Sequence, residues 1–328
     1  MSGTPWVTVA GEALIDLVPG TGTDAFVARP GGSPFNVAVG LARLGTSTSL
    51  LARLADNAFG RMLRDHAAAE GIDLSTAPHA IEPTTLAVVS LDAQRQASYD
   101  FYVDGTADWQ WTAAEIARMR PDTRVLHLGS IASWTPPGSE QLQALADRLH
   151  NAGDVLVSHD PNVRPLLLGE PARAREIIER SIGSSHVVKA SRDDVEWLYP
   201  SIGLDHVGAR WVELGASLVI LTDGSQGAVA YRPDALALPR PGLTVDVADT
   251  VGAGDAFTAG FLNGLVRRGL EHPSSLATLS DGTLADLMDD AVLVSALTCR
   301  KVGADPPRLN LAELVAPESR LLENDLVP

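Results

Sequence analysis

The feature that most constrains the fold of this chain is an alternation of short apolar runs with amphipathic stretches of helical period. The apolar runs are strand-like, and in the middle of the chain a helical segment precedes each one. They read WVTVAG, TSLLARL, RVLHLGS, DVLVSHD, SHVVKAS and SLVILTDG. Strands that alternate with helices join into a parallel sheet that is covered on both faces. The alternation therefore predicts an α/β fold.

Two helices are predicted near the N-terminus from their periodicity and their end signals. The first is NVAVGLARLG, whose apolar residues recur at helical spacing and which ends on Gly45. The second is NAFGRMLRDHAAAEG, which opens at Asn57 and closes at Gly71. Asparagine is a good N-cap, and glycine commonly ends a helix.

One region breaks the alternation and predicts a second, smaller sheet. Residues Thr84 to Tyr102 form two β-type runs around the polar turn DAQRQ, with no helix between them. The segment DAFVARPGG, near Asp24, is another short extended piece. We expect these pieces to pair outside the main sheet. The sequence has no low-complexity linker and no clear internal repeat, so residues 1–328 are predicted to form one domain.

The charge balance and the single cysteine limit the classes of partner and the compartment. Lys and Arg number 25 against 41 Asp and Glu, which gives a net charge of -16. Without a basic face, nucleic acids and anionic membranes are excluded as expected partners. Cys299 is the only cysteine, which fits a reducing compartment. The first residues lack a basic n-region and the apolar runs are too short to span a bilayer, so we expect a cytoplasmic protein.

The stretch DTVGAGDAFTAGFLNGL, from Asp249 to Leu265, carries the strongest chemical signal. Small residues precede Asp255, and a helix-periodic run follows it. The N-terminus of a helix attracts anions, and glycines let a phosphate approach the backbone closely. A carboxylate there suits a general base that takes a proton from an attacking hydroxyl. It equally suits a plain helix cap beside a tight turn, and these residues alone leave both interpretations open.

Two further stretches suggest contacts to a polyhydroxylated ligand. In GGSPFNVAVGLARLG, two glycines and Asn36 precede a helix, as in a backbone platform with an amide for hydroxyl groups. In GEALIDLVPG, Asp16 follows the first strand, and ligands bind at the carboxyl ends of strands in open α/β sheets. A packed loop and a surface turn are the simpler alternatives for these two stretches.

Together these stretches resemble the PfkB (ribokinase-like) family of carbohydrate kinases. The family has a Gly-Gly stretch with Asn before a helix, and far from it a D-T-x-G-A-G-D loop, which is matched here at every fixed position of Asp249–Asp255. The resemblance covers nearly the whole chain, from GEALIDLVPG to CRKVGADPP. The phrases GEALIDLVPG, DPNVRP and VVKAS make the chain most similar to the fructokinase branch.

The resemblance implies a ribokinase-like αβα sandwich with a mainly parallel sheet and a small β lid, formed by about 17–31 and 84–108. It implies that Asp255 is the catalytic base, with an anion hole made by Gly252, Ala253 and Gly254. The implied sugar contacts are Asp16, Gly31, Gly32, Asn36, Asn162 and Arg164. The implied nucleotide contacts are Lys189, Thr222, Gly224, Gly227 and Ser295.

The resemblance also implies ATP with Mg²⁺ as cofactor, and a potassium ion beside the anion hole. Many relatives carry Asn-x-x-Glu where this chain reads SRDD, so that Asp194 keeps a carboxylate that would bind magnesium through water. Asp249 and the backbone near Lys301 and Gly303 are the candidates for potassium, although Pro307 replaces a serine ligand of some relatives.

We therefore expect an ATP-dependent sugar kinase that transfers the γ-phosphate to a sugar hydroxyl, with fructose as the first choice. The alternatives are a kinase for 2-keto-3-deoxygluconate, ribose or a nucleoside, and a non-catalytic module that binds sugar or nucleotide. A dehydrogenase is disfavoured because the sequence has no credible dinucleotide fingerprint, and G-x-x-x-x-G-K-[ST] is absent. Lid strands of the family often pair across a dimer, so a homodimer is expected.

Overall fold

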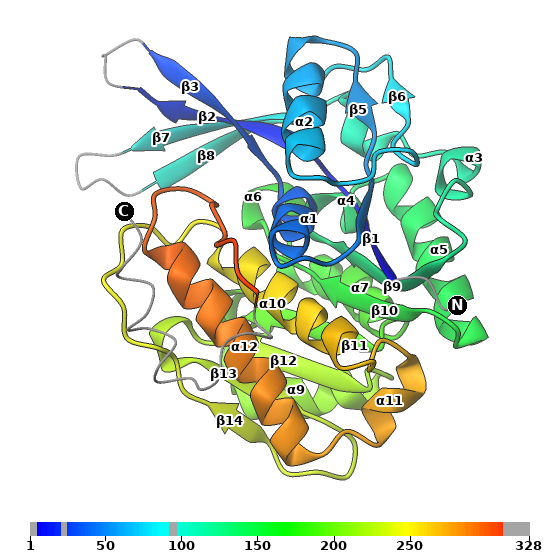
Figure 1. Ribbon diagram of the computed structural model, residues 1–328, viewed down its shortest axis with the longest axis vertical. Helices are drawn as coiled ribbons and strands as arrows, with labels where there is room; N and C mark the ends of the chain where they lie inside the picture. The colour runs from blue at the N-terminus through cyan, green and yellow to red at the C-terminus, as the bar shows by residue number, and fades with distance from the viewer. Residues whose placement is uncertain (1–4, 21–24, 92–96, 311–328) are drawn as a thin grey trace.

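The computed structural model describes residues 5–20, 25–91 and 97–310. Its centre is a sheet of eight described strands in the order β14-β13-β12-β11-β10-β9-β1-β4, with helices on both faces (Figure 1). The strands are β1 (Trp6–Ala10), β4 (Thr48–Leu51), β9 (Thr123–Gly129), β10 (Leu156–Asp160), β11 (Val187–Ser191), β12 (Leu218–Thr222), β13 (Ala228–Tyr231) and β14 (Leu238–Arg240). The predicted α/β class is confirmed.

The sheet is parallel from β4 to β12 and antiparallel at one edge. Six neighbouring strands run the same way, and β13 and β14 then pair antiparallel with β12 and with each other. The alternation of strands and helices predicted the parallel part. It did not identify the edge strands, because β12 and β13 are joined by a short turn with only a 3₁₀ segment, η2 (Gly224–Gln226).

Helices cover the sheet in two layers. One layer contains α1 (Ser33–Arg43), α10 (Ala253–Arg267) and α12 (Asp281–Cys299); the other contains α4 (Ser130–Trp134), α5 (Gly138–Ala152), α7 (Pro171–Ile182), α8 (Arg192–Leu198) and α9 (Leu204–Glu213). The remaining elements are α2 (Ala58–Ala69), α3 (Ala113–Ile116), α6 (Pro165–Leu168), α11 (Pro273–Ala277), η1 (Ala107–Trp109), β5 (Leu54–Ala55) and β6 (His79–Ala80).

Alternating side chains of the buried strands divide the core between these two layers. Leu156 of β10 and Val187 of β11 belong to the apolar cluster that includes α1, α10 and α12. Their neighbours Val157 and Val188 face the opposite layer. Because successive side chains on a strand point to opposite faces, every second residue after Leu156 and Val187 also faces α10.

The helix α10 lies close to its neighbours because small residues occupy the contacts. A Cβ atom on Gly40 of α1 would lie 2.7 Å from Ala259 Cβ of α10. A Cβ atom on Gly260 of α10 would lie 2.9 Å from Ala291 Cα of α12. The three helices therefore pack almost backbone to backbone, which fixes where the N-terminus of α10 meets the sheet.

A second sheet, in the order β3-β2-β7-β8, projects from the main body (Figure 1). Its strands are β2 (Leu14–Pro19), β3 (Phe26–Gly31), β7 (Leu86–Leu91) and β8 (Ala97–Tyr102). The hairpin predicted between Thr84 and Tyr102 is the antiparallel pair β7–β8, and its turn DAQRQ lies outside the described residues. The segment GEALIDLVPG, in which no strand was recognised, supplies β2, so this sheet begins earlier than residue 17.

Helix ends follow the predicted signals with one difference. Asn57 caps α2 by accepting a hydrogen bond from the N–H of Gly60, and Gly71 after the helix has a φ of +74°. The first helix, α1, begins at Ser33 rather than at Asn36, with Pro34 in its first turn. Proline fits this place because the N–H groups of a first turn have no partner within the helix.

Candidate active site

The N-terminus of α10 is the centre of the candidate site. Gly252 precedes the helix with a φ of +77°, and a Cβ atom there would lie 2.5 Å from Ala304 Cβ. Glycine is therefore required on two grounds, a left-handed backbone and a close contact. The helix begins at Ala253, so Asp255 lies in its first turn. Backbone N–H groups of a first turn point outward and give the helix end a partial positive charge.

Two side chains from α1 hold the carboxylate of Asp255. Ser33 Oγ donates a hydrogen bond to one carboxylate oxygen at 2.6 Å, and Asn36 Nδ2 donates to the other at 2.8 Å. Asp255 is only 8% exposed. Burial raises the pKa of Asp255, and the bonds from Ser33 and Asn36 partly oppose that rise. The group is thus a fixed carboxylate whose basicity exceeds that of an ordinary aspartate.

A buried ion pair lies next to this carboxylate. Lys189 Nζ, from β11, is 2.9 Å from Asp160 Oδ2, at the end of β10. A Cβ atom on Gly254 would lie 2.7 Å from Lys189 Nζ, so the ammonium group lies beside the first turn of α10. Asp160 was not predicted as a site residue. The sequence feature that could have identified Asp160 is its place as the acidic residue that ends the strand-like run DVLVSHD.

Asp16 lies in strand β2 of the projecting sheet rather than in a surface turn. Burial raises the pKa of Asp16 to about 6, with Arg164 lowering it and Asp255 raising it. These two charges place Asp16 within electrostatic reach of the α10 terminus. A Cβ atom on Gly31 would lie 2.2 Å from Asp16 Oδ2, so the glycine makes room for this carboxylate. Gly32, with a φ of +101°, then turns the chain into α1.

The loop after β10 carries the other predicted sugar contacts. Asn162 has a φ of +39°, and its N–H donates to Asp160 Oδ1 at 3.1 Å. Arg164 Nη1 donates to the amide oxygen of Asn162 at 2.7 Å and to two backbone carbonyl oxygens of the same loop. Asn162 and Arg164 thus bind each other, and Arg164 is close enough to Asp16 to influence its pKa.

The predicted nucleotide residues form a second group along the same edge of the sheet. Thr222 ends β12 and lies opposite Ser191 of β11. Gly224 begins η2 and Gly227 follows it, with φ values of +50° and +99°, and a Cβ atom on Gly227 would lie 2.1 Å from the carbonyl oxygen of Arg240. Ser295 is half-buried on α12. No described contact joins Thr222, Gly224, Gly227 or Ser295 to Asp255, so their role stays a prediction.

The predicted metal residues occupy two separate places. Asp194 is buried, and its carboxylate accepts hydrogen bonds from Val163 N, Ser191 N and Ser191 Oγ. Asp249 accepts a hydrogen bond from Gly303 N at 2.8 Å, which joins the loop before α10 to the loop after α12. Lys301 is in the latter loop, with its side chain paired to Asp305. Among residues 5–20, 25–91 and 97–310 no cluster of three or more His, Cys, Asp or Glu side chains could hold a metal ion.

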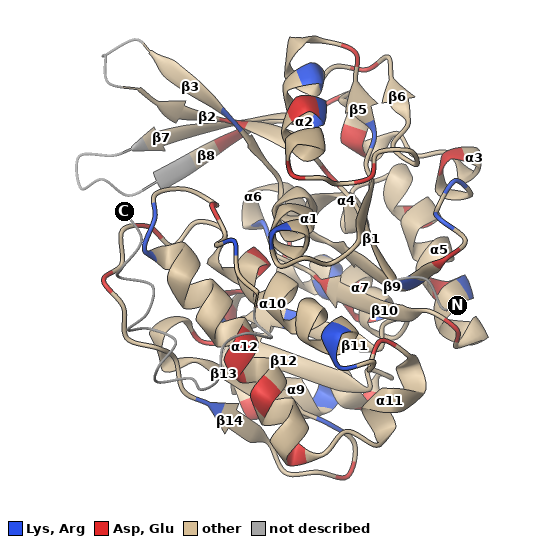
Figure 2. Ribbon diagram, in the orientation of Figure 1, with Lys and Arg blue, Asp and Glu red and all other residues tan. Residues whose placement is uncertain are grey.

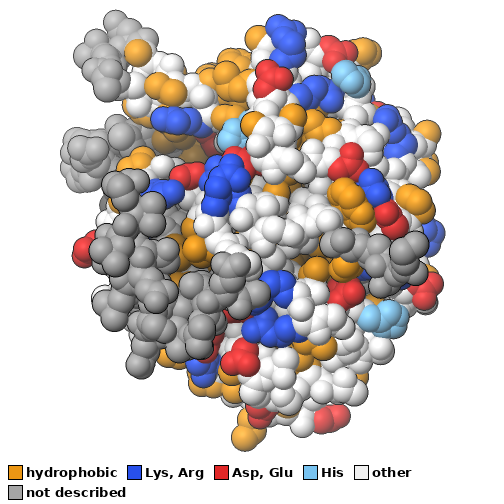
Figure 3. All heavy atoms as spheres, viewed as in Figure 1, with side chains coloured by type: hydrophobic (Ala, Val, Ile, Leu, Met, Phe, Trp, Pro, Cys, Tyr) orange, Lys and Arg blue, Asp and Glu red, His pale blue; other side chains and the backbone are white. Residues whose placement is uncertain are grey.

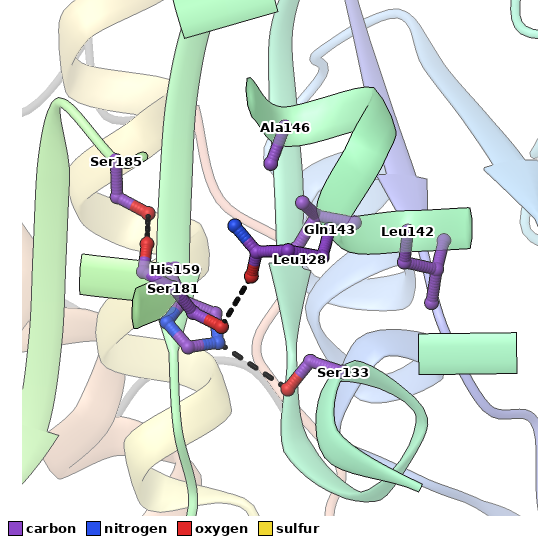
Figure 4. A pocket seen from close by; sticks show the side chains of 8 residues that line it. All are labelled: Leu128, Ser133, Leu142, Gln143, Ala146, His159, Ser181 and Ser185. Carbon is purple, nitrogen blue, oxygen red and sulfur yellow. Dashed lines mark hydrogen bonds between the residues drawn. The ribbon is translucent and has the colours of Figure 1, made fainter. Parts of the chain in front are cut away.

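A small polar cavity lies on the opposite face of the sheet and does not belong to this site. Figure 4 shows His159, Ser133, Gln143 and Ser181 around it, with Ser181 donating a hydrogen bond to Gln143. The other lining residues are Leu128, Leu142, Ala146 and Ser185. Burial lowers the pKa of His159 to about 4, so the cavity is polar but uncharged.

The charged side chains show no basic stripe on the visible face. In Figure 2 the acidic and basic residues are scattered along a mostly uncharged ribbon, and in Figure 3 basic side chains occur in small separate groups among acidic and uncharged ones. The visible face thus carries charges of both signs, in a chain of net charge -16. Within the part of the chain that the structure describes, every helix is too short or too polar to cross a membrane.

Comparison with known proteins identifies the family of this chain. Residues 6–310 match the pfkB family carbohydrate kinase. The chain belongs to the pfkB family of carbohydrate kinases. A fructokinase of Rhizobium leguminosarum bv. trifolii is 35% identical over 281 residues, which cover 85% of each chain.

Solved structures of pfkB-family relatives extend the match to the fold. Fructokinase with bound ATP from Xylella fastidiosa superposes with a TM-score of 0.86 at 25% identity, over 98% of this chain and 99% of the other. A fructokinase double mutant from Vibrio cholerae, bound to fructose, ADP and potassium ion, has a TM-score of 0.80 at 28% identity, over 93% and 95% of the two chains. This chain is therefore a carbohydrate kinase of ribokinase-like fold.

Proposed function

We propose that this carbohydrate kinase is an ATP-dependent fructokinase in which Asp255 is the general base. The observation that carries the proposal is the position of Asp255, buried in the first turn of α10 and held by Ser33 and Asn36. A carboxylate fixed in this way is suited to accept the proton of a sugar hydroxyl, because Ser33 and Asn36 each occupy only one lone pair of its oxygens. The hydroxyl oxygen then attacks the γ-phosphorus, and the bond from that phosphorus to the bridging oxygen of ATP breaks.

Charge that develops on the transferring group needs stabilisation, and the helix terminus supplies it. Backbone N–H groups at Gly252 and Gly254 are suited to the phosphoryl oxygens, because glycines leave the backbone open. The N–H of Ala253 donates to the carbonyl oxygen of Thr250 at 3.2 Å, so it would have to share or exchange that bond to join them. The ammonium of Lys189 adds a full positive charge beside Gly254. In a protein of net charge -16, the helix terminus and this ammonium are the groups that attract the anionic triphosphate, although the carboxylate of Asp160 balances part of the ammonium charge.

The sugar is proposed to bind between the projecting sheet and the main sheet. Asp16 would accept hydrogen bonds from vicinal hydroxyls, and Gly31, Gly32 and Asn36 would form the floor, with Asn162 and Arg164 at one side. Fructose is supported by the fructokinases among the relatives, one of which is described with fructose bound. The projecting sheet would act as the lid, with Asp16 on its inner face.

The nucleotide is proposed to lie beside Lys189, Thr222, Gly224, Gly227 and Ser295. Magnesium would be held mainly by the ATP phosphates and would neutralise their charge, with Asp194 reached through water. All three hydrogen bonds of Asp194 come from protein donors, which agrees with an indirect rather than a direct contact. Potassium is proposed beside Asp249, where the loop containing Lys301 and Gly303 supplies backbone carbonyl groups.

A coupled assay of ADP release tests the proposed reaction. The assay compares fructose, ribose, 2-keto-3-deoxygluconate and nucleosides at fixed MgATP, with a reaction lacking any acceptor as the blank. We expect the highest kcat/KM with fructose. A higher value with another acceptor would replace fructose but keep the kinase, whereas no acceptor-dependent ADP release at all would favour a non-catalytic binding module.

We further propose a cytoplasmic homodimer that is joined through the lid sheet. Phe26 and Tyr102 are 54% and 62% exposed, and the register of the four strands puts both on the face opposite to Asp16. Exposed aromatic residues on one sheet face favour a second copy as partner. A single half-buried cysteine and a need for ATP agree with a cytoplasmic location.

A further inference from the structure

Asp160 and Lys189 form a buried ion pair. The prediction that Lys189 contacts the nucleotide gives no role to its partner Asp160. The two side chains are 1% and 9% exposed, with 2.9 Å between Oδ2 and Nζ. The other carboxylate oxygen, Asp160 Oδ1, accepts the N–H of Asn162 at 3.1 Å. Both oxygens of Asp160 therefore have fixed partners, one of which is the ammonium group.

The sheet brings these two side chains together on the α10 side. Leu156 and Val187 face α10, and side chains two or four residues further along the same strand point to the same face. Asp160 and Lys189 therefore also lie on the α10 side. His159 pairs with Val188, so the next residues along the two parallel strands are neighbours. On the other side, Asp160 pairs with Gly129, where a Cβ atom would lie 2.4 Å from the carbonyl oxygen of Asp160. The glycine lets the backbones approach at this edge.

Stability alone gives little reason for such a pair. Removing a carboxylate and an ammonium from water costs several kcal/mol for each ion, and their attraction often does no better than apolar residues of the same size. Burial would lower the pKa of Lys189, but Asp160 and Asp194 outweigh burial and raise that pKa, so the ammonium keeps its charge. A charged lysine in a buried site beside an anion-binding helix end points to a role in the reaction.

We propose that Asp160 is a positioning residue for phosphoryl transfer, holding the ammonium of Lys189 against Gly254 so that it faces the transferring phosphoryl group. The inference rests on the proposed kinase reaction. Gly254 has no side chain, and a Cβ atom there would lie 2.7 Å from Lys189 Nζ, in the space of the ammonium. The lysine stem is flexible, so a fixed partner is needed to define where its charge lies.

Asp160 also keeps Lys189 away from the catalytic carboxylate. Lys189 lies near enough to Asp255 to lower its pKa. Without Asp160, the ammonium would be free to pair with Asp255, which would make that carboxylate a weaker base and remove the charge from the phosphoryl group. Displacements of about 1 Å in such sites cost on the order of 10²-fold in rate.

A double-mutant cycle on the full chain tests the proposal, with Asp160→Asn, Lys189→Met and the double variant. Each keeps the approximate shape of the side chain and removes its charge. We expect Asp160→Asn to lower kcat about 10- to 100-fold, while calorimetry gives an unchanged fructose affinity. In the Lys189→Met background, Asp160→Asn should lower kcat by less than about 3-fold, because Asp160 then has no ammonium to position.

The matched control is Asp73→Asn, which removes a carboxylate that pairs with Arg120 at 2.8 Å outside the candidate site. This variant should leave kcat unchanged. The double variant removes both charges of the ion pair together, so it keeps the cycle informative if a single variant folds poorly. A wild-type kcat in Asp160→Asn would overturn the proposal. So would an equal loss of kcat from Asp160→Asn in the wild type and in the Lys189→Met variant. Rescue of Asp160→Asn by higher MgCl₂ would instead assign Asp160 to magnesium. A wild-type enzyme without sugar-dependent turnover would overturn the proposed function itself.

Discussion

At the scale of single residues, the site depends on how two side chains of α1 hold the carboxylate of Asp255. Ser33 and Asn36 each donate to one oxygen, and they lie more than 200 residues from Asp255 in the sequence, at separations of 222 and 219. The family resemblance singled out Asp255 and Asn36 and assigned Asn36 to the sugar, but it gave no role to Ser33. A partner that is remote in sequence becomes visible only when α1 and α10 pack together.

Replacing Asp255 with asparagine should abolish most of the turnover and leave the fold intact. Asparagine has nearly the same shape but cannot take the proton of the attacking hydroxyl. General-base catalysis contributes on the order of 10²–10⁴-fold, so kcat should fall by about that factor. Steady-state kinetics and fructose calorimetry measure the two effects separately. Turnover at the wild-type rate, with chemistry shown to be rate-limiting, would remove Asp255 from the role of base.

Replacing Asp16 with asparagine should stabilise the protein at neutral pH and weaken fructose binding. Burial raises the pKa of Asp16 from 3.8 to about 6, so keeping this group ionised disfavours the folded state above pH 6. The loss in free energy of unfolding begins as the pH rises above 3.8, the pKa of the group in the unfolded chain. The loss reaches up to about 3 kcal/mol once the group in the folded protein has also lost its proton. Below pH 3.8 both states hold the proton and the loss vanishes.

Urea unfolding of the wild type and Asp16→Asn at pH 4 and pH 8 measures this difference. The variant should gain free energy of unfolding at pH 8 and almost none at pH 4. Fructose affinity should fall by roughly 1.5–3 kcal/mol, because charge-assisted hydrogen bonds are lost. Equal stability of the two proteins at both pH values would mean that Asp16 is well solvated in solution.

At the scale of elements, the close packing of α1, α10 and α12 fixes the position of the α10 terminus that carries Asp255. The sequence predicted α10 as a helix, because the periodicity that follows Asp255 is local. It did not predict that Gly40 and Gly260 lie at helix contacts, since an isolated glycine in a helix carries no information about its neighbours. The antiparallel strands β13 and β14 escaped prediction for a similar reason, because their pairing depends on a turn at Gly224–Gln226 rather than on periodicity.

Replacing Gly260 with valine should destabilise the protein, although Gly260 touches no reacting group. A Cβ atom there would lie 2.9 Å from Ala291 Cα and 3.1 Å from Val294 Cγ2, so α10 and α12 would have to separate. Overpacking of this kind typically costs about 1–3 kcal/mol. Chemical denaturation gives the free energy of unfolding, and kcat should fall as well because the terminus of α10 moves.

The matched control for Gly260→Val is Gly282→Ala, at the start of α12. Its Cβ atom would meet only Ser280 Oγ, at 4.0 Å, so nothing has to shift. Alanine is favoured over glycine within helices by up to about 1 kcal/mol, so this variant should be as stable as the wild type or slightly more so. Similar losses of stability in both variants would show that the helix contact is not the cause.

At the scale of the whole molecule, the main sheet carries Asp160 and Lys189 and the projecting sheet carries Asp16. The β-rich region from Thr84 to Tyr102 predicted a second sheet, because a hairpin is encoded by neighbouring residues. Strand β2 was missed because its pairing partners, β3 and β7, come from separate parts of the chain. How the two sheets face each other depends on long-range packing, which a pattern of apolar residues does not contain.

The outer face of the projecting sheet makes the proposed homodimer testable by a single substitution. Phe26 is 54% exposed on this face, and aspartate in its place would put a charge into the interface, where burying it without a partner is unfavourable. Sedimentation velocity should give a dimer for the wild type and a monomer for Phe26→Asp. Leu236→Asp is the control, because Leu236 is 93% exposed between β13 and β14 and its substitution should leave the dimer intact. A wild-type monomer at micromolar concentration would refute the proposed assembly. A dimer that survives Phe26→Asp would place its interface elsewhere, and Asp16 would then close over the sugar without help from a second copy.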